Sequence, residues 1–197
     1  MRIGIDIDDT IAKTREQTDV YAKEYTEKVL NRPFTMRTES THDPKWARFI
    51  YSWSIDEDKN FWSLYYDKIV ENVTPKEDAV DVINELSKKH EIILISARWE
   101  KGNGTVKKLT EDWLAKYDIH FDKIYLGYLD KKDIAKENNV DVFIEDSIKT
   151  ARDIKSLGIK VLLMNSHQNK DIEVSDIKRV FCWKEIYREI ERIEANS

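Results

Sequence analysis

Apolar and polar residues alternate over the first eight positions of the chain, a period-2 pattern typical of a β-strand. Isoleucines occupy every second position from residue 3 to residue 7, and the other side of the strand turns acidic at Asp6 and Asp8. Asp9 follows directly, so three carboxylates stand together at the end of one short strand. Their mutual repulsion at a buried sheet is costly unless a cation neutralises it. The pattern therefore predicts a bound divalent metal, and carboxylate oxygens favour Mg²⁺.

From residue 74 onward, helical and strand patterns alternate. Thr74 and Glu77 fit a capping box around Pro75, so a helix is expected to begin there. The apolar run 92–95 is the kind found in parallel strands that are covered on both faces. Further helices are expected at about 104–117, 131–138, 148–157 and 184–195, and further strands near 123–126, 141–145 and 160–164. This alternation predicts an α/β fold, a Rossmann-like parallel sheet core with helices on both faces.

Residues 14–73 interrupt this rhythm with helical patterning and no convincing strand. One helical face carries Tyr21, Tyr25 and Val29 and would end before Pro33. A dense set of aromatic residues follows: Trp46, Phe49, Tyr51, Trp53, Phe61, Trp62, Tyr65 and Tyr66. We expect most of these rings to pack inside a small helical unit, and some of them to line a lid.

Two domains are therefore expected. Residues 1–13 and 74–197 would form the α/β core, and residues 14–73 would form a small helical cap inserted after the first strand. An insertion at this point would hang over the carboxyl ends of the strands, where open α/β sheets bind ligands.

Composition narrows the classes of function. The chain has 33 Lys and Arg against 38 Asp and Glu, a net charge of −5, with both signs intermixed. This distribution argues against a polymeric nucleic acid as partner. Without a run of eighteen apolar residues or an apolar leader, we expect a cytoplasmic protein that does not enter a membrane. Cys182 is the only cysteine, which excludes an intrachain disulfide, and the four histidines show no metal-ligand spacing.

Residues able to carry out phosphate chemistry follow successive predicted strands. They are Asp6 and Asp8, then Ser96, then Glu145 and Asp146, with Lys131 and Lys132 opening the helix before the last of these strands. One carboxylate can attack phosphorus and a second can carry a proton, while a metal, a lysine and a hydroxyl hold the phosphate oxygens. Each residue alone is uninformative, since a lysine is usually solvated and an acidic pair can cap a helix. The ordered set indicates a site for a metal and a phosphate.

Four segments carry this set: Asp6-Ile7-Asp8-Asp9-Thr10, Ile95-Ser96-Ala97, Lys131, and Ile144-Glu145-Asp146-Ser147. In this order they resemble the four motifs of the haloacid dehalogenase superfamily, most of whose members are Mg²⁺-dependent phosphatases. The resemblance covers nearly the whole chain. It implies that Asp6 is the nucleophile that becomes an aspartyl phosphate, and that Asp8 first protonates the leaving oxygen and then acts as a base towards water.

The same resemblance implies the remaining roles. Mg²⁺ would lie between the Asp6 carboxylate, the Asp8 backbone carbonyl and Asp146. The phosphate would be bound by Asp9, Thr10, Ser96, Ala97 and Lys131. Glu145 would lie behind the metal ligands. Lys131 fits the related pattern better than Lys132, because it stands two residues before Asp133, although both lysines remain open.

A helical insertion between the first two motifs is similar to the cap of one branch of the superfamily. Within that branch, the Asp-Asp-Thr start and the Glu-Asp-Ser ending resemble bacterial relatives of the type C 5′(3′)-deoxyribonucleotidases. Two positions depart from related patterns. Asp9 stands where glycine is frequent, which leaves the chemistry intact if only backbone is needed there. Thr150 stands where some branches have a second metal-binding aspartate, which shifts charge onto Glu145.

We therefore expect a Mg²⁺-dependent phosphomonoester hydrolase acting on a small phosphorylated substrate. The expected substrate is a (deoxy)nucleoside monophosphate, and a pyrimidine deoxyribonucleotide is one candidate. A ring such as Trp46, Phe49 or Trp53 would stack on the base, which is favourable by roughly 1–3 kcal/mol. A sugar phosphate or another small phosphomonoester is the alternative substrate. No pattern indicates the oligomeric state.

Two other classes of protein are weighed against this expectation. A receiver-type signalling domain also gathers acids, a hydroxyl and a lysine on a parallel sheet, but its phosphoacceptor would lie on a middle strand and it would lack the long helical insertion. A catalytically silent metal-binding protein of the same fold is the other, and nothing visible disables the site, because Asp6 and Asp8 are both present.

Overall fold

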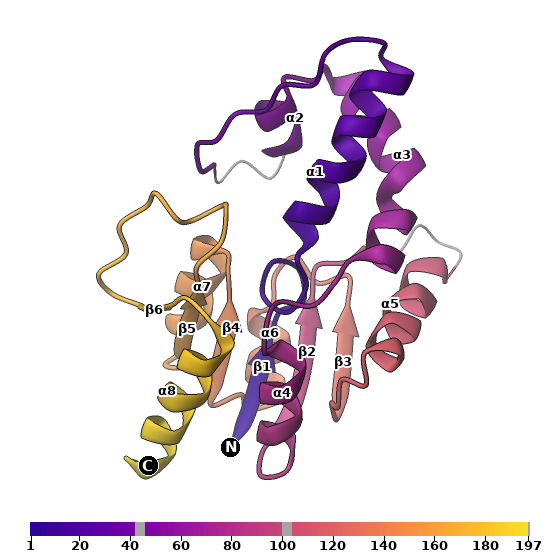
Figure 1. Cartoon of the computed structure of the whole chain (residues 1–197). Helices are drawn as coiled ribbons and strands as arrows, with labels where there is room; N and C mark the ends of the chain where they lie inside the picture. The colour runs from indigo at the N-terminus through magenta and orange to yellow at the C-terminus, as the bar shows by residue number, and fades with distance from the viewer. Residues whose placement is uncertain (42–45, 100–103, 197) are drawn as a thin grey trace.

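A parallel sheet forms the centre of the molecule. The structure is a computed structural model that describes residues 1–41, 46–99 and 104–196. Over these residues, six strands lie in the order β3-β2-β1-β4-β5-β6, and every neighbouring pair is parallel. The strands are β1 (Arg2–Ile5), β2 (Glu91–Ser96), β3 (Lys123–Leu126), β4 (Val142–Glu145), β5 (Lys160–Met164) and β6 (Lys178–Val180) (Figure 1). The α/β sheet predicted from the sequence is confirmed.

Helices cover both faces of this sheet (Figure 1). One face packs against α4 (Ala79–Ser87), α5 (Thr105–Lys116) and α8 (Trp183–Ala195), and the other packs against α6 (Lys132–Glu137) and α7 (Ile148–Lys155). The strands are apolar on both sides because both sides are covered. Gly4 of β1 is required by this packing, since a Cβ there would lie 2.5 Å from the Phe143 ring of β4.

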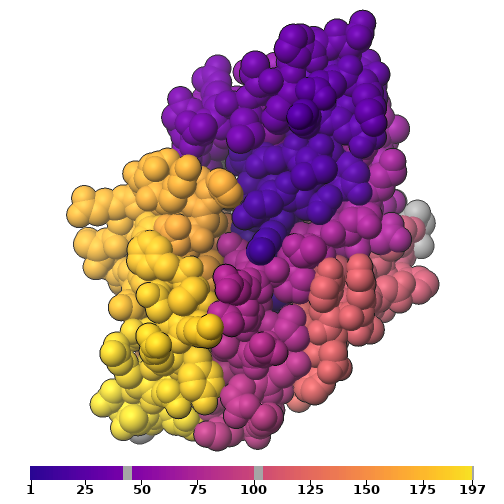
Figure 2. Space-filling view, viewed as in Figure 1, coloured from indigo at the N-terminus to yellow at the C-terminus, as the bar shows by residue number. Residues whose placement is uncertain are grey.

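Residues 14–73 are called here the helical segment, and those of them that the structure describes lie beyond the carboxyl ends of the strands and form the upper lobe in Figures 1 and 2. The helical segment contains α1 (Thr14–Glu24), a π-helical turn η1 (Tyr25–Val29), α2 (Trp46–Tyr51) and α3 (Ile55–Asn72). Its core is aromatic, with Tyr25 and Phe61 fully buried. The lower part of the segment joins the sheet layer through contacts of α3 with α5. None of the helices described in either lobe has the length and apolarity that a membrane crossing requires.

The predicted capping box at Thr74 and Glu77 is wrong. Helix α4 begins later, at Ala79, and has no side-chain cap. The backbone of residues 74–76 instead pairs with that of residues 11–13, through hydrogen bonds and an isolated bridge. The two crossings between the lobes run side by side here, and this tertiary pairing overrides the local capping signal.

The first helix and the last strand also differ from expectation. Helix α1 changes to the π-helical turn at Tyr25, and Val29 is 48% exposed and does not share a buried face with Tyr25. A π-turn shifts every following side chain around the helix axis, which the 3.6-residue pattern does not anticipate. Strand β6 was not predicted, because its three residues include Lys178 and Arg179.

Candidate active site

The carboxyl ends of the central strands meet the helical segment around a pocket of about 290 Å³. The sheet side of this pocket is lined by Asp6 and Asp8 after β1, Lys131 before α6, and Glu145 and Asp146 at the end of β4. The side of the helical segment contributes Trp46, Trp62 and Tyr66. Residues far apart in the sequence are brought together because neighbouring parallel strands end at the same edge of the sheet.

Three buried carboxylates form the centre of the pocket. One oxygen each of Asp6, Glu145 and Asp146 lies within 4.8 Å of the others. The Lys131 ammonium donates to Asp6 Oδ1 (2.5 Å) and to Glu145 Oε2 (2.8 Å). This group, Asp6, Glu145, Asp146 and Lys131, is called the acidic centre below. Three carboxylates against one ammonium leave it with excess negative charge.

The excess charge shows in the acid-base properties of the acidic centre. Burial, joined by the charges of Glu145 and Asp8, raises the pKa of Asp6 to about 7 despite the opposing effect of Lys131. Burial and the carboxylates of Asp9, Glu145 and Asp6 raise the pKa of Asp146 well above its usual value. Asp146 Oδ2 is buried and has no hydrogen-bond partner. A cation bound among these oxygens would offset the repulsion between the carboxylates and would give Asp146 Oδ2 a partner.

Between the two lysines left open by the sequence, Lys131 is the one at the acidic centre. It is 4% exposed and fixed by two carboxylates. Lys132 is half-buried, and its backbone N–H donates to Asp130 Oδ1. Glu145 lies in the acidic centre itself: Oε1 accepts the backbone N–H groups of Asp146 and Ser147, so this carboxylate is held in place from both sides.

The Asp8 side chain lines the same pocket and is paired with Arg98. The Arg98 guanidinium donates to both carboxylate oxygens of Asp8, the shortest distance being 2.9 Å from Nη2 to Oδ1, and Thr14 Oγ1 donates to Oδ1 at 2.6 Å. Burial by itself would raise the pKa of Asp8, but the charge and hydrogen bonds of Arg98, with that of Thr14, lower the pKa overall. Sequence reasoning missed Arg98.

The residues after Asp8 form a tight turn. Asp9 has a left-handed φ of 59°, a conformation that glycine adopts most easily and aspartate tolerates. Its Oδ1 accepts the backbone N–H of Arg15 (2.8 Å), and burial raises its pKa to about 7. Thr10 Oγ1 donates to Asp6 Oδ2 (3.3 Å), so the predicted phosphate-binding residue contacts the predicted nucleophile.

The second motif lies at the end of β2. Ser96 is fully buried, and its Oγ accepts the backbone N–H of Arg98 (3.1 Å). Ala97 lines the pocket. Ser96 is not among the described residues that line the pocket, and its hydroxyl contacts the backbone of the turn that contains Ala97.

The aromatic residues divide differently from the expectation. Of the three rings proposed for the base, Trp46 lines the pocket, 4.7 Å below the Arg15 guanidinium. Phe49 instead faces Arg37 (4.6 Å), and Trp53 is buried in the helical segment, where its indole N–H donates to Thr26 Oγ1. Neither Phe49 nor Trp53 is among the described residues that line this pocket. Trp62 and Tyr66 belong to the aromatic set of which some rings were expected to line a lid, and both line the pocket.

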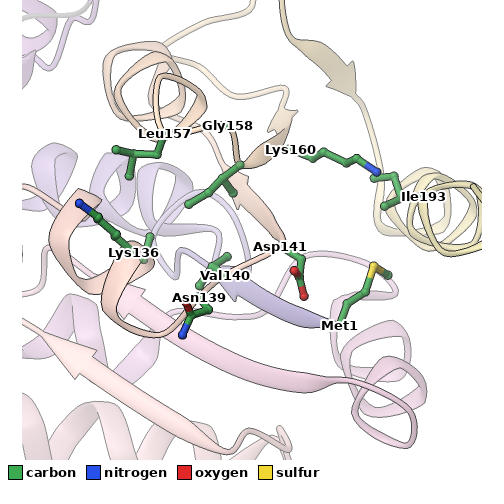
Figure 3. Close-up of a pocket in the computed structure, with 11 residues that line it drawn as sticks. Met1, Lys136, Asn139, Val140, Asp141, Leu157, Gly158, Lys160 and Ile193 are labelled. Carbon is green, nitrogen blue, oxygen red and sulfur yellow. The ribbon is translucent and has the colours of Figure 1, made fainter. Parts of the chain in front are cut away.

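A larger hollow, of about 510 Å³, lies at the opposite edge of the sheet (Figure 3). Residues at the amino ends of β4 and β5 line it, among them Asp141 and Lys160, together with Ile193 of α8. None of the acidic centre belongs to it. The smaller pocket is therefore the candidate active site, because the cluster of buried carboxylates lies there and not in the larger hollow.

Comparison with known proteins identifies the family. The model of the family described as 5′ nucleotidase, deoxy (pyrimidine), cytosolic type C protein matches residues 1–196. The chain belongs to this nucleotidase family. A nucleotidase of Clostridium acetobutylicum is 30% identical over 199 residues, which cover 100% of this chain and 97% of that protein.

Solved structures of other proteins share the fold of this nucleotidase family member. A haloacid dehalogenase-like family hydrolase from Streptococcus pneumoniae superposes with a TM-score of 0.65 at 16% identity, covering 96% of this chain and 97% of the other. A predicted phosphatase from Clostridium acetobutylicum gives a TM-score of 0.64 at 13% identity, covering 97% and 98%. The family makes the protein a phosphoric monoester hydrolase, its fold is that of haloacid dehalogenase-like hydrolases, and the resemblance inferred from the motifs is confirmed.

Proposed function

We propose that this hydrolase is a Mg²⁺-dependent nucleotidase that cleaves (deoxy)nucleoside monophosphates through an aspartyl phosphate on Asp6. The observation that carries the proposal is the acidic centre with Lys131, at the base of a pocket that aromatic rings of the helical segment enclose. The same arrangement supports residues 14–73 as a cap domain over the α/β core.

The donor set of the acidic centre fits a hard divalent cation. Asp6 and Asp146, with the backbone carbonyl of Asp8, would hold Mg²⁺, and the buried, unpaired Asp146 Oδ2 supports this assignment. Both oxygens of Glu145 already accept hydrogen bonds, so Glu145 would hold Lys131 and the turn after β4. When bound, the metal supplies positive charge for the phosphate oxygens.

The side chains divide the reaction into two steps. The Asp6 carboxylate attacks phosphorus, the ester P–O bond breaks, and the leaving oxygen takes a proton from Asp8. Asp8 must therefore be protonated in the substrate complex, although Arg98 favours its ionised form in the free protein by lowering its pKa. Asp8, now ionised, takes a proton from a water molecule whose oxygen attacks phosphorus, which frees the Asp6 carboxylate and inorganic phosphate. Lys131 offsets the negative charge around the phosphoryl group. The backbone of Asp9 and Ala97, with the hydroxyls of Thr10 and Ser96, would hold the phosphate or shape the turns around it.

The nucleoside assignment rests on the pocket wall opposite the acidic centre. Trp46, Trp62 and Tyr66 present ring surface there, and stacking of a base on such a ring is worth roughly 1–3 kcal/mol. The matching family carries a pyrimidine deoxynucleotidase description, and the Clostridium acetobutylicum relative is a nucleotidase.

Phosphate release from a panel of phosphomonoesters tests this proposal, with Mg²⁺ or with excess chelator, for the wild type, Asp6→Asn and the surface control Asp133→Asn. We expect metal-dependent release that Asp6→Asn abolishes and the control retains, with nucleoside monophosphates as the best substrates. Activity that survives in Asp6→Asn would refute the aspartyl phosphate. Equal rates on sugar phosphates and nucleotides would refute the nucleotidase assignment.

Thermal unfolding tests the metal site without turnover. Mg²⁺ should raise the melting temperature of the wild type, because a ligand of the folded state stabilises it by mass action. Asp146→Asn should lose this rise, while its metal-free melting temperature should stay equal or increase, since one repelling charge is gone. A full Mg²⁺-induced rise in Asp146→Asn would contradict the ligand assignment.

A further inference from the structure

Arg98 is a charged residue in an unusual place. It follows the second motif directly, is 3% exposed, and lies between the sheet edge and helix α5. Burying a guanidinium is costly unless its charge and its N–H groups find partners. The partners of Arg98 therefore indicate what the residue does.

Asp8 takes up one whole edge of the guanidinium. Nε donates to Asp8 Oδ1 (3.2 Å) and Oδ2 (3.1 Å), and Nη2 donates to Oδ1 (2.9 Å). A planar fork that meets both oxygens fixes the plane of the carboxylate as well as its position, which a single ammonium cannot do. Thr14 Oγ1 donates to the same carboxylate (2.6 Å) from the start of α1.

The guanidinium is itself held from behind. Nη1 donates to Thr110 Oγ1 (3.3 Å), and the Trp113 ring lies 5.5 Å from the guanidinium carbon, both residues belonging to α5. The backbone N–H of Arg98 is fixed by Ser96 Oγ. The Arg98 side chain is therefore a rigid support that reaches from α5 to Asp8.

We propose that Arg98 is the positioning residue of Asp8: its guanidinium, supported by Thr110 and Trp113, holds the Asp8 carboxylate where the leaving oxygen of the substrate is protonated. The inference rests on the proposed function in one respect, the role of Asp8 as proton carrier. It adds a residue outside the four motifs to the machinery of the reaction. Arg98 acts through Asp8 and need not touch the substrate.

Substrates whose leaving groups differ in basicity can show whether Arg98 positions Asp8 for proton transfer or only stabilises the fold. Nitrophenolate leaves without a proton, whereas the oxygen of an alkyl phosphate such as a nucleoside 5′-monophosphate needs one. Single-turnover rates with enzyme in excess would report the first step for Arg98→Met, Arg98→Lys, Thr110→Val and a surface control on α5, Lys116→Met. Melting temperatures would show that each variant folds.

We expect Arg98→Met to slow transfer from the alkyl phosphate by about 100-fold, the order of magnitude of general acid catalysis, and transfer from p-nitrophenyl phosphate only a few-fold. Arg98→Lys should lie between Arg98→Met and the wild type, Thr110→Val should show a smaller loss of the same kind, and the control should show none. Equal losses on both esters, or no loss on either, would overturn the proposal.

A crystal structure of Arg98→Met distinguishes this proposal from the proposed function. The Asp8 carboxylate should leave its wild-type position, and an unmoved Asp8 would overturn the inference whatever the rates. If Asp8 moves but Asp8→Asn slows both esters equally, Arg98 still positions Asp8, and it is the proton-carrier role of Asp8 in the proposed function that fails.

Discussion

At the scale of single residues, the acidic centre contains buried charges that would each destabilise the fold alone and that stabilise one another as ion pairs. Lys131 is buried between Asp6 and Glu145, and removing it would leave two buried carboxylates facing Asp146 without a cation. Breaking such a buried pair typically destabilises a protein by about 3–5 kcal/mol. In the proposed mechanism the same lysine offsets the negative charge of the bound phosphate.

Lys131→Met is therefore expected to lower kcat/KM by about 100-fold or more and to lower the melting temperature in the absence of metal. Its neighbour provides a matched control: Lys132 is only half-buried and is not among the residues lining the pocket, so Lys132→Met should stay within about twofold of the wild type. Steady-state kinetics and calorimetry measure both effects. If Lys132→Met were the more damaging of the two, the assignment of Lys131 would be reversed.

At the scale of elements, the loop between β5 and β6 supports the acidic centre by holding the backbone of Asp146. Asn169 is fully buried, and its amide donates to the carbonyls of Asp146 (2.7 Å) and Met164 (2.8 Å). Arg179 of β6 donates to the side-chain and backbone oxygens of Asn169. Strand β6 thus reaches Asp146 through one arginine and one asparagine.

We expect Asn169→Ala to destabilise the protein by about 2–4 kcal/mol, because it leaves at least two buried carbonyls without a donor. It should also weaken Mg²⁺ binding, since the backbone of Asp146 loses its tether. Asn165→Ala is the control. Asn165 is half-buried, and its side-chain oxygen accepts a hydrogen bond from Arg179 as that of Asn169 does, so the effects of this substitution should be smaller. Urea unfolding and the Mg²⁺-induced rise in melting temperature measure the two losses. Normal Mg²⁺ binding in Asn169→Ala would limit Asn169 to a role in stability.

The elements also show which parts of the fold and site the sequence could predict. Long apolar runs gave β2 and β4, and the acids at the ends of β1 and β4 were found because strand ends are marked by a change from apolar to charged residues. Arg98 was missed because an arginine after a strand is normally expected to be solvated, and its partner Asp8 lies 90 positions away. A pairing over this distance cannot be predicted from local sequence patterns.

At the scale of the whole molecule, side chains of the helical segment contact the core at two places, one through stacked rings and one through hydrogen bonds. Tyr66 of α3 stacks on Trp99, with ring centroids 5.2 Å apart and planes 16° from parallel. Ser40 Oγ donates to Asp171 Oδ2 (3.0 Å) and to the His167 carbonyl (2.9 Å) in the loop after β5. The pocket is thus enclosed by both lobes, and the choice of substrate is expected to depend on residues of the helical segment.

Helix α2 allows this dependence to be tested with two rings three positions apart. Trp46 lines the pocket, whereas Phe49 faces Arg37, so Trp46→Leu should raise KM for nucleoside monophosphates by about tenfold or more, the equivalent of roughly 1–3 kcal/mol of lost stacking. The KM for a small phosphomonoester without a base should change little, and Phe49→Leu should leave both values unchanged. A KM that rises equally for both substrates in Trp46→Leu would mean that the ring closes the pocket without recognising a base. An unchanged KM for nucleotides would place the base against another wall, with Trp62 and Tyr66 the next rings to replace.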